Sequence, residues 1–275
     1  MDIRLLASDL DRTLLDSKHE VSAENKAALE ACAEKGVVLV AATGRALSAV
    51  PEGVRKVRGM RYIVCSNGAK VFENDGTKLL YERYISREAV DYIRPLLEDG
   101  EVLCEFFWGG YPYVQQDRYD RHEAIPGWFL EYFLASRKPV PDMARAIEEH
   151  LHEIENINFV FADDAVKERL RGYLAARTDL YEFTSSMPFN FEIGGVGVSK
   201  ASALDFVCAR EGILPAQCIC FGDSENDAHM IAWAGIGVAM GNAVPEAKAA
   251  AGHVTGDNEH SGVAQALYAL GVLPC

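Results

Sequence analysis

Two aspartates placed two residues apart, Asp9 and Asp11, are the residues of this sequence best suited to chemistry. They follow an apolar run, residues 3–7, that is typical of a buried strand, so both carboxylates stand at a strand end. One carboxylate can attack phosphorus to form an acyl phosphate, and the other can protonate the leaving group and later deprotonate water. The pair therefore predicts phosphoryl transfer, with Asp9 as the nucleophile and Asp11 as the acid and base.

A calcium-binding loop is the alternative for this segment. Asp9, Asp11, Thr13 and Glu20 match the first, third, fifth and twelfth positions of an EF-hand. The sixth position is Leu14, however, where that loop requires glycine, and a strand rather than a helix precedes it. The sequence therefore favours phosphoryl transfer.

A second acidic segment lies at residues 222–227, after another apolar run, and it begins with Asp223 and contains Asn226. Its three carboxylates and one amide form a dense group of hard oxygen ligands, which suits a magnesium ion. A lone acidic turn of this kind usually caps a helix. Beside Asp9 and Asp11, the metal-binding interpretation is the stronger of the two.

Thr43 and Gly44 follow a third apolar run and precede a helix that we predict over residues 45–57. A hydroxyl and unpaired backbone amides would then face one point, where an anion could bind. A threonine in this place is more often a simple helix cap. For Arg45, a salt bridge that orients the loop is favoured over contact with phosphate.

Lys200 follows the glycine-rich residues 194–199 and precedes another predicted helix. This segment is not a P-loop, because Ser199 stands where that motif requires glycine. By itself Lys200 would be a solvated surface lysine. In the company of the other segments, it is a point charge suited to a phosphoryl oxygen and a carboxylate.

The elements around these segments predict how they are brought together. Residues 1–66 alternate strand and helix, and the same alternation returns from residue 200. The residues between have an α+β pattern. We therefore predict an α/β fold with a doubly wound, Rossmann-like parallel-sheet core, residues 1–85 and 191–275, and an inserted α+β cap domain, residues 86–190. In open sheets of this kind, ligands bind at the carboxyl ends of the strands, where all four segments would lie.

The composition of the chain excludes some classes of binding partner. The chain has 275 residues, 49% of them hydrophobic, and a formal net charge of -14. An acidic protein repels nucleic-acid backbones and anionic membranes, so we expect neither partner, and any anionic ligand must be captured locally. The seven cysteines are scattered without metal-ligand spacing. No leader or membrane span is evident, and a reducing, cytoplasmic location is expected. The sequence does not predict the oligomeric state.

The four segments, in this order, resemble the motifs of the haloacid dehalogenase (HAD) superfamily of phosphatases, and specifically the Cof-type hydrolases with a type IIB cap. Motif one corresponds to residues 9–15, motif two to residues 42–45, motif three to residues 197–200 and motif four to residues 222–227. The resemblance covers nearly the whole chain. It implies a magnesium-dependent phosphatase that works through an aspartyl-phosphate.

Carried over position by position, the resemblance also implies roles. Asp9 would be both nucleophile and metal ligand, and Asp11 would be acid and base with its backbone carbonyl on the magnesium ion. Asp223 would be the third protein ligand. The phosphoryl group would be held by the Leu10 amide, Thr43, Gly44, Lys200 and Asn226.

Two further segments are informative, one at Arg12 and one at Asn67 and Gly68. The family usually has glycine where this chain has Arg12, which affects the local backbone but removes no catalytic group. The arginine either adds positive charge near the site or, the favoured alternative, points to solvent. Asn67 and Gly68 resemble a Cof-type element that lines the entrance, and a plain turn is the equal alternative.

The sequence thus predicts a phosphatase of small phosphorylated metabolites, with sugar phosphates as the first substrate class. A phosphomutase of the same superfamily and a non-catalytic module that binds phosphate esters are the alternatives. We expect the cap to be a mobile lid that selects the substrate, because every catalytic candidate lies outside it. Most cap aromatics should fill the cap's own core, and some could contact the substrate; they are Phe106, Trp108, Tyr111, Tyr113, Tyr119 and Trp128.

Overall fold

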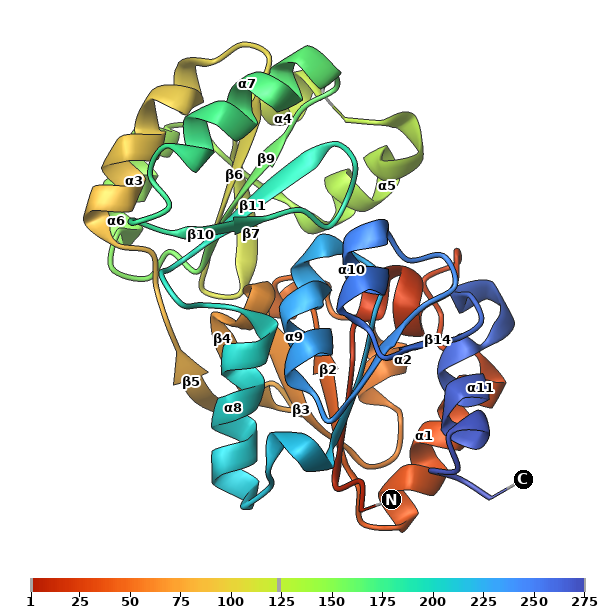
Figure 1. Ribbon diagram of the computed structural model, residues 1–275. Helices are drawn as coiled ribbons and strands as arrows, with labels where there is room; N and C mark the ends of the chain where they lie inside the picture. Colours follow the sequence, from red (N-terminus) through yellow and green to blue (C-terminus); the bar gives the residue numbers. More distant parts are fainter. Residues whose placement is uncertain (1, 123–124, 275) are drawn as a thin grey trace. The chain divides into compact units, whose positions relative to one another are not determined.

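The computed structural model describes residues 2–122 and 125–274, and it describes Trp128 without its side chain (Figure 1). The chain divides into two compact units. We call Met1–Gly44, Val50–Glu82 and Ser199–Cys275 the core unit, and Arg45–Ala49 with Arg83–Val198 the inserted unit. The domain limits given above, at residues 85/86 and 190/191, stay a prediction.

The core unit is built on one eight-stranded sheet with the order β14-β13-β12-β1-β2-β3-β4-β5. The strands from β14 to β3 are parallel to their neighbours, whereas β4 and β5 extend the sheet as antiparallel strands. The α/β prediction is therefore confirmed, with a mixed rather than purely parallel sheet. Its strands are β1 (Leu5–Ser8), β2 (Val38–Ala42), β3 (Met60–Cys65), β4 (Lys70–Glu73), β5 (Leu79–Glu82), β12 (Cys218–Gly222), β13 (Ile236–Ala239) and β14 (His253–Val254).

The position of β1 in this sheet determines which segments meet. Leu5 pairs with Val38 of β2 on one side and with Cys218 of β12 on the other, all in parallel. Parallel neighbours end at the same edge of the sheet, so the residues that follow β1, β2 and β12 lie next to one another. The register therefore brings motifs one, two and four together.

Helices cover the core sheet, and α8 packs beside α9 and α1 beside α11 (Figure 1). One apolar cluster joins Leu5 and Ala7 of β1 to Ala203 and Leu204 of α8. Burial of this cluster is what fixes α8, and hence its first residue, against the sheet. The helices of the core unit are α1 (Ala23–Glu34), α2 (Glu52–Arg55), α8 (Lys200–Glu211), α9 (Ala228–Trp233), α10 (Pro245–Ala250) and α11 (Gly262–Ala269).

The single helix predicted over residues 45–57 is wrong. The structure has a short 3₁₀ turn at Leu47–Ala49 and then the one-turn helix α2. Pro51 explains the interruption, because proline lacks a backbone N–H and disfavours helical geometry in the residue before it. Consequently no helix begins directly after Gly44.

The inserted unit contains a six-stranded sheet with the order β10-β11-β9-β6-β7-β8. All its pairs are antiparallel except β7 with β8. This sheet with its helices confirms an inserted α+β module. Its strands are β6 (Leu103–Trp108), β7 (Tyr111–Gln115), β8 (Lys138–Val140), β9 (Asn156–Val160), β10 (Glu182–Thr184) and β11 (Asn190–Gly194), and its helices are α3 (Arg87–Ile93), α4 (Gln116–Arg121), α5 (Gly127–Ser136), α6 (Met143–His150) and α7 (Asp164–Ala175).

Alternation along β6 gives the inserted sheet two different faces. Phe106 and Trp108 belong to an apolar cluster with residues of α3, α6 and α7. Glu105, the residue before Phe106, points to the opposite face and is fully buried there. Both aromatics thus fill the unit's own core as expected, whereas Tyr111 is exposed and the side chain of Trp128 lies outside the described residues.

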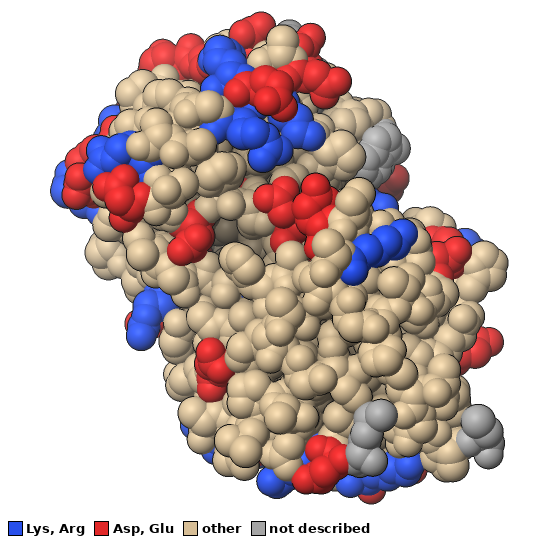
Figure 2. Space-filling model, in the orientation of Figure 1, with Lys and Arg blue, Asp and Glu red and all other residues tan. Residues whose placement is uncertain are grey.

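The surface of the inserted unit carries mixed charge. Figure 2 shows Lys and Arg side chains lying among Asp and Glu side chains on the face drawn. Arg87 lies 3.2 Å from Glu148, and Arg177 lies 2.9 Å from Asp179. In the described part of the chain, no helix combines the length and apolar character needed to cross a bilayer.

Candidate active site

Asp9 is held at the end of β1 by its own backbone. Its N–H donates to the Phe221 carbonyl at 3.0 Å, which continues the ladder between β1 and β12, and the Ser8 hydroxyl donates to its carbonyl at 2.8 Å. The residue is nearly buried, with 6% exposed. The strand pairing therefore places this carboxylate inside the core unit rather than at its surface.

Lys200 brings two carboxylates together. Its Nζ atom donates to Asp9 Oδ1 and to Asp227 Oδ1, each at 2.6 Å. The lysine is fully buried and opens α8, whose start is fixed by reciprocal hydrogen bonds between Ser199 and Ser202. Thus the surface-lysine alternative is wrong, because the side chain is enclosed in a cluster of acids.

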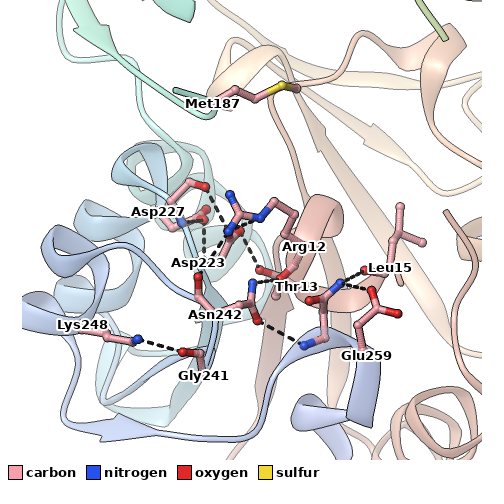
Figure 3. Close-up of polar contacts among 12 residues, drawn as sticks. Arg12, Thr13, Leu15, Met187, Asp223, Asp227, Gly241, Asn242, Lys248 and Glu259 are labelled. Atoms are coloured by element: carbon pink, nitrogen blue, oxygen red, sulfur yellow. Dashed lines mark hydrogen bonds and ion pairs between the residues drawn. The ribbon is translucent and has the colours of Figure 1, made fainter. Parts of the chain in front are cut away.

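Asp223 completes the acidic cluster (Figure 3). Its Oδ1 accepts from the Thr13 hydroxyl at 3.2 Å, and its Oδ2 accepts from the Ser224 hydroxyl at 3.1 Å. Arg12 Nε lies 3.5 Å from the same Oδ2. Carboxylate oxygens of Asp9, Asp223 and Asp227 all lie within 4.8 Å of one another. The structure thus brings together two of the predicted metal ligands and Asp227, one of the acids of residues 222–227 for which the sequence predicted no role of its own.

Asp227 is that missed residue. Its Oδ2 accepts the backbone N–H groups of Asp223, at 2.9 Å, and Ser224, at 3.0 Å, while its Oδ1 serves Lys200. Gly222 makes room for it, since a Cβ there would lie 2.4 Å from the Cβ of Asp227. The signal was in the sequence, because Asp227 closes the acidic segment that starts at Asp223. Only the structure shows that it organises the turn and pairs with the lysine.

Crowding of these acids changes their pKa values. Burial, together with the Asp227 carboxylate, raises the pKa of Asp9 well above its usual range, although Lys200 opposes the shift. Burial and the Asp227 carboxylate also raise the pKa of Asp223 to about 7. The charge of Arg12 and the hydrogen bonds that Asp223 accepts from two hydroxyls oppose this shift. Burial alone would lower the pKa of Lys200, but the carboxylates of Asp227 and Asp9 outweigh it and raise the pKa.

The cluster is therefore chemically suited to a cation. Lys200 contacts two of the three buried carboxylates, Asp9 and Asp227, and Asp223 is paired only with the half-exposed Arg12. The charge of the three carboxylates therefore exceeds that of the one buried lysine among them. Oxygen donors in such a group are the ligands that magnesium prefers. The donor set and its excess charge fit a divalent metal ion.

Asp11 lies at the rim of this cluster rather than within it. Its side chain is 34% exposed, and Oδ1 lies 3.7 Å from His19 Nδ1. The charge of Asp11 makes a small contribution to the raised pKa of Asp9. Between them, the carbonyl of Leu10 accepts the N–H of Leu15 at 2.8 Å, which closes the loop after β1.

Thr43 and Gly44 follow β2 as predicted, and Thr43 is buried. The Thr43 N–H donates to the Val64 carbonyl at 2.9 Å, so this amide belongs to the sheet. The Thr43 amide is therefore not one of the free amides that the sequence predicted here, and no helix begins directly after Gly44. Of the groups that the sequence proposed here, the Thr43 hydroxyl and Gly44 stay candidates.

Asn226 meets Asn67, because its Nδ2 donates to Asn67 Oδ1 at 3.0 Å. Gly68 follows with a φ of +103°, and a Cβ there would lie 2.1 Å from the Ser199 carbonyl oxygen. Only glycine permits this contact between the turn and the start of α8. The Asn67-Gly68 turn thus lies against the segment that carries Lys200.

Comparisons with known proteins agree with this arrangement. The haloacid dehalogenase-like hydrolase family matches residues 6–267. The 5-amino-6-(5-phospho-D-ribitylamino)uracil phosphatase YcsE of Bacillus subtilis is 30% identical over 267 residues, which cover 97% of this chain and 95% of that protein. An HMP-PP phosphatase of Serratia proteamaculans is 29% identical over 89% of this chain and 86% of its own length. The solved structure of a HAD subclass IIB sugar phosphatase is 25% identical, with a TM-score of 0.82 over 98% of this chain and all (100%) of that one.

Three observations lead to the same family. They are the family match over most of the chain, the acidic cluster at the carboxyl edge of the sheet, and the inserted second sheet. The chain therefore belongs to the haloacid dehalogenase-like hydrolases, in the Cof-type subfamily IIB, and is a phosphatase, that is, a phosphoric monoester hydrolase of small phosphorylated metabolites.

Proposed function

We propose that the protein is a magnesium-dependent phosphatase that hydrolyses small phosphorylated metabolites through an aspartyl-phosphate on Asp9, with sugar phosphates as its first substrate class. The observation that carries the proposal is the buried contact of Lys200 with both Asp9 and Asp227, at 2.6 Å each. A lysine in this place holds the Asp9 carboxylate in one orientation and can also attract a phosphoryl oxygen. A passive binding module would not need a nucleophile so positioned.

Two carboxylates divide the chemistry between them. Asp9 Oδ would attack phosphorus, with the bond to the leaving oxygen breaking as the acyl phosphate forms. Asp11, which is more exposed, would donate its proton to that leaving oxygen and then take a proton from the water that hydrolyses the intermediate. The Leu10 amide, Thr43, Gly44, Lys200 and Asn226 are proposed to hold the other phosphoryl oxygens.

Asp9, Asp223 and the backbone carbonyl of Asp11 are the proposed ligands of a magnesium ion. Asp227 belongs to the same cluster, but its two oxygens already accept from Lys200 and from two backbone amides. We therefore propose that Asp227 positions the lysine and the turn instead of binding the ion. When bound, magnesium would neutralise charge on the phosphoryl oxygens.

The inserted unit is proposed to choose the substrate. The residues with proposed chemical roles all belong to the core unit, and a site that binds only a phosphoryl group and a metal ion cannot distinguish one leaving group from another. The relatives named above act on different compounds, a ribitylaminouracil phosphate, HMP-PP and sugar phosphates, by their names. Sugar phosphates come first because the resemblance to the Cof-type hydrolases implies them, and a sugar phosphatase of subclass IIB is similar to this chain over 98% of its length.

The test is release of free phosphate from a panel of phosphate monoesters with magnesium present, by the wild-type protein and by Asp9→Asn. The variant should lose at least about a thousandfold in kcat while remaining folded, because an amide cannot form the acyl phosphate. Asp75→Asn makes the same change at an exposed carboxylate of the core unit and should keep full activity.

Three results would contradict the proposal. Substantial turnover by a folded Asp9→Asn protein would exclude the covalent intermediate. Appearance of an isomeric phosphate ester in place of free phosphate would indicate a phosphomutase. Binding of esters without any turnover would indicate a module that senses them.

A further inference from the structure

Arg12 occupies a backbone conformation that disfavours it. Its φ of 60° and ψ of 11° lie in the left-handed region, where a residue with a Cβ is strained and glycine is not. An arginine in this place must therefore gain something through its side chain that offsets the strain.

Hydrogen bonds to Asn242 hold the side chain of Arg12 in place (Figure 3). Arg12 Nη2 donates to the Asn242 carbonyl at 3.3 Å, and Asn242 Nδ2 donates back to the Arg12 carbonyl at 2.8 Å. Asn242 is itself held, because its Oδ1 accepts the Asn258 N–H at 3.1 Å and Asn258 Nδ2 donates to the Leu15 carbonyl at 3.0 Å. The guanidinium group is thus anchored beside the acidic cluster before any ligand binds.

Asp223 does not need Arg12 for its own hydrogen bonds. Its two carboxylate oxygens already accept from the hydroxyls of Thr13 and Ser224. Arg12 Nε approaches Oδ2 at 3.5 Å, which is an ion pair longer than a good hydrogen bond. Positioning of Asp223 therefore accounts for only part of what the guanidinium group can do.

The remaining donors of Arg12 face outward. The side chain is 48% exposed, and in the described part of the chain Nη1 has no hydrogen-bond or ion-pair partner. Lys200 differs, since it is fully buried and divided between two carboxylates. Of these two cations, only Arg12 has planar, uncommitted donors that a second anionic group could reach.

We propose that Arg12 is a specificity-determining residue that binds a second anionic group of the substrate, next to the phosphoryl group that is removed. The inference rests on the proposed function. The preferred substrates would carry a phosphoryl or carboxylate group close to the scissile P–O bond, because the anchored guanidinium group lies 3.5 Å from Asp223, a proposed metal ligand of the same site. Organic diphosphates and phosphate esters of 2-hydroxy acids share this chemistry.

Two matched pairs of substrates distinguish a second phosphoryl group from a carboxylate group. The first pair is methyl diphosphate with methyl phosphate, and the second is 2-phosphoglycerate with glycerol 2-phosphate. For each pair the measured quantity is the ratio of kcat/KM, doubly anionic over singly anionic. The ratio for wild type should exceed that of Arg12→Gly and Arg12→Gln by at least about tenfold in one pair or both, the effect of one charge-assisted contact.

Further variants distinguish charge from shape and fold. Arg12→Gly also relieves the strained backbone, so loss of folding should not confound it. Arg12→Lys should keep part of the ratio, because the charge stays but the planar donors are lost. Lys18→Gln removes a cation from an exposed position of the same segment and should leave the ratio unchanged.

A binding measurement tests the inference without turnover. Inorganic pyrophosphate should protect the wild-type protein against thermal unfolding at lower concentrations than inorganic phosphate does, and Arg12→Gly should lose this preference. Equal kcat/KM losses on both members of each pair would overturn the inference and indicate that Arg12 only positions Asp223. No phosphate release from any ester by wild type would contradict the proposed function instead, and the pyrophosphate preference would still decide the role of Arg12.

Discussion

Each unit of the protein encloses a cluster of charged side chains, and the two clusters are balanced differently. In the core unit, three buried carboxylates, those of Asp9, Asp223 and Asp227, lie together with one buried lysine. Lys200 contacts Asp9 and Asp227, and the half-exposed Arg12 lies 3.5 Å from Asp223. In the inserted unit, one acid, Glu105, faces one base, Arg137. Both clusters are removed from solvent, so the difference is in charge rather than in burial.

The Glu105–Arg137 pair of the inserted unit is matched in charge. Arg137 Nε donates to Glu105 Oε1 at 2.8 Å and Nη2 donates to Oε2 at 3.1 Å, while Asn158 Nδ2 also donates to Oε2 at 2.8 Å. The guanidinium group lies 5.2 Å from the ring centroid of Phe129. Burial alone would lower the pKa of Arg137, but the Glu105 carboxylate outweighs it and raises the pKa.

The charge balance of a buried cluster distinguishes a functional site from a structural one. A buried pair with matched charge and complete hydrogen bonds has no capacity for a further ion. The core cluster keeps excess negative charge, and burial raises the pKa of Asp9 and Asp223. Such a cluster costs stability unless a cation binds, and that cost is typical of a functional site.

The largest expected effect comes from removing one acid of the unbalanced cluster. Asp223→Asn should reduce phosphatase kcat by about a thousandfold to ten-thousandfold, or about 4–5.5 kcal/mol, because the proposed magnesium site loses a charged ligand. Magnesium should also raise the unfolding temperature of wild type and not that of the variant. Phosphate release and calorimetry with and without a chelator measure both effects. Full wild-type activity in the presence of chelator would refute the magnesium site.

A smaller effect is expected from the balanced cluster, and it concerns stability. Glu105→Gln should lower the free energy of unfolding by about 3–4 kcal/mol, because Arg137 stays buried without a charged partner. Urea unfolding measures the change. The double variant Glu105→Met with Arg137→Met should recover most of the loss, since a matched apolar pair leaves no buried charge. A single variant as stable as wild type would mean that the pair is not enclosed as described.

The smallest expected effect is an increase in stability when an acid of the core cluster is removed in the absence of metal. The pKa of Asp223 is raised to about 7, so between its unfolded pKa of about 4 and that value the folded state binds a proton that the unfolded state releases. Stability is therefore lost as the pH rises through this window. Asparagine cannot ionise, so chelated Asp223→Asn should be more stable than chelated wild type, by about 1–3 kcal/mol near pH 8. The advantage should shrink toward about pH 4. An advantage that grows as the pH falls would contradict this account.

Much of this arrangement could be predicted from the sequence. Apolar runs that end in Asp9, Thr43 and Asp223 identify three strands of one parallel sheet, and parallel strands share an edge. The change of pattern after the hairpin of β4 and β5 identifies the inserted module. These features are local in sequence, or depend on a rule of sheet geometry that holds for any α/β protein.

The remainder depends on contacts between distant residues. Asp227 looks like one more acid of a turn, and only its contact with Lys200 shows its role. Arg12 was expected to point to solvent, yet it is both half-exposed and paired with Asp223. The apolar neighbours of Glu105 suggest that it is buried, but nothing along the chain links it to Arg137, which lies 32 residues away. Single-sequence patterns carry no information on such pairings.

The distance along the chain between Asp9 and Lys200 has a consequence for synthesis. The two residues in contact are 191 positions apart, and β1 gains its second neighbour only when β12 has been made. A growing chain that ends before Cys218 therefore contains the whole sequence of the inserted unit while one edge of β1 stays unpaired. Unpaired strand edges favour aggregation, and long loops close slowly. We expect nascent and C-terminally truncated chains to depend on chaperones, and the active site to be the last part of the protein to form.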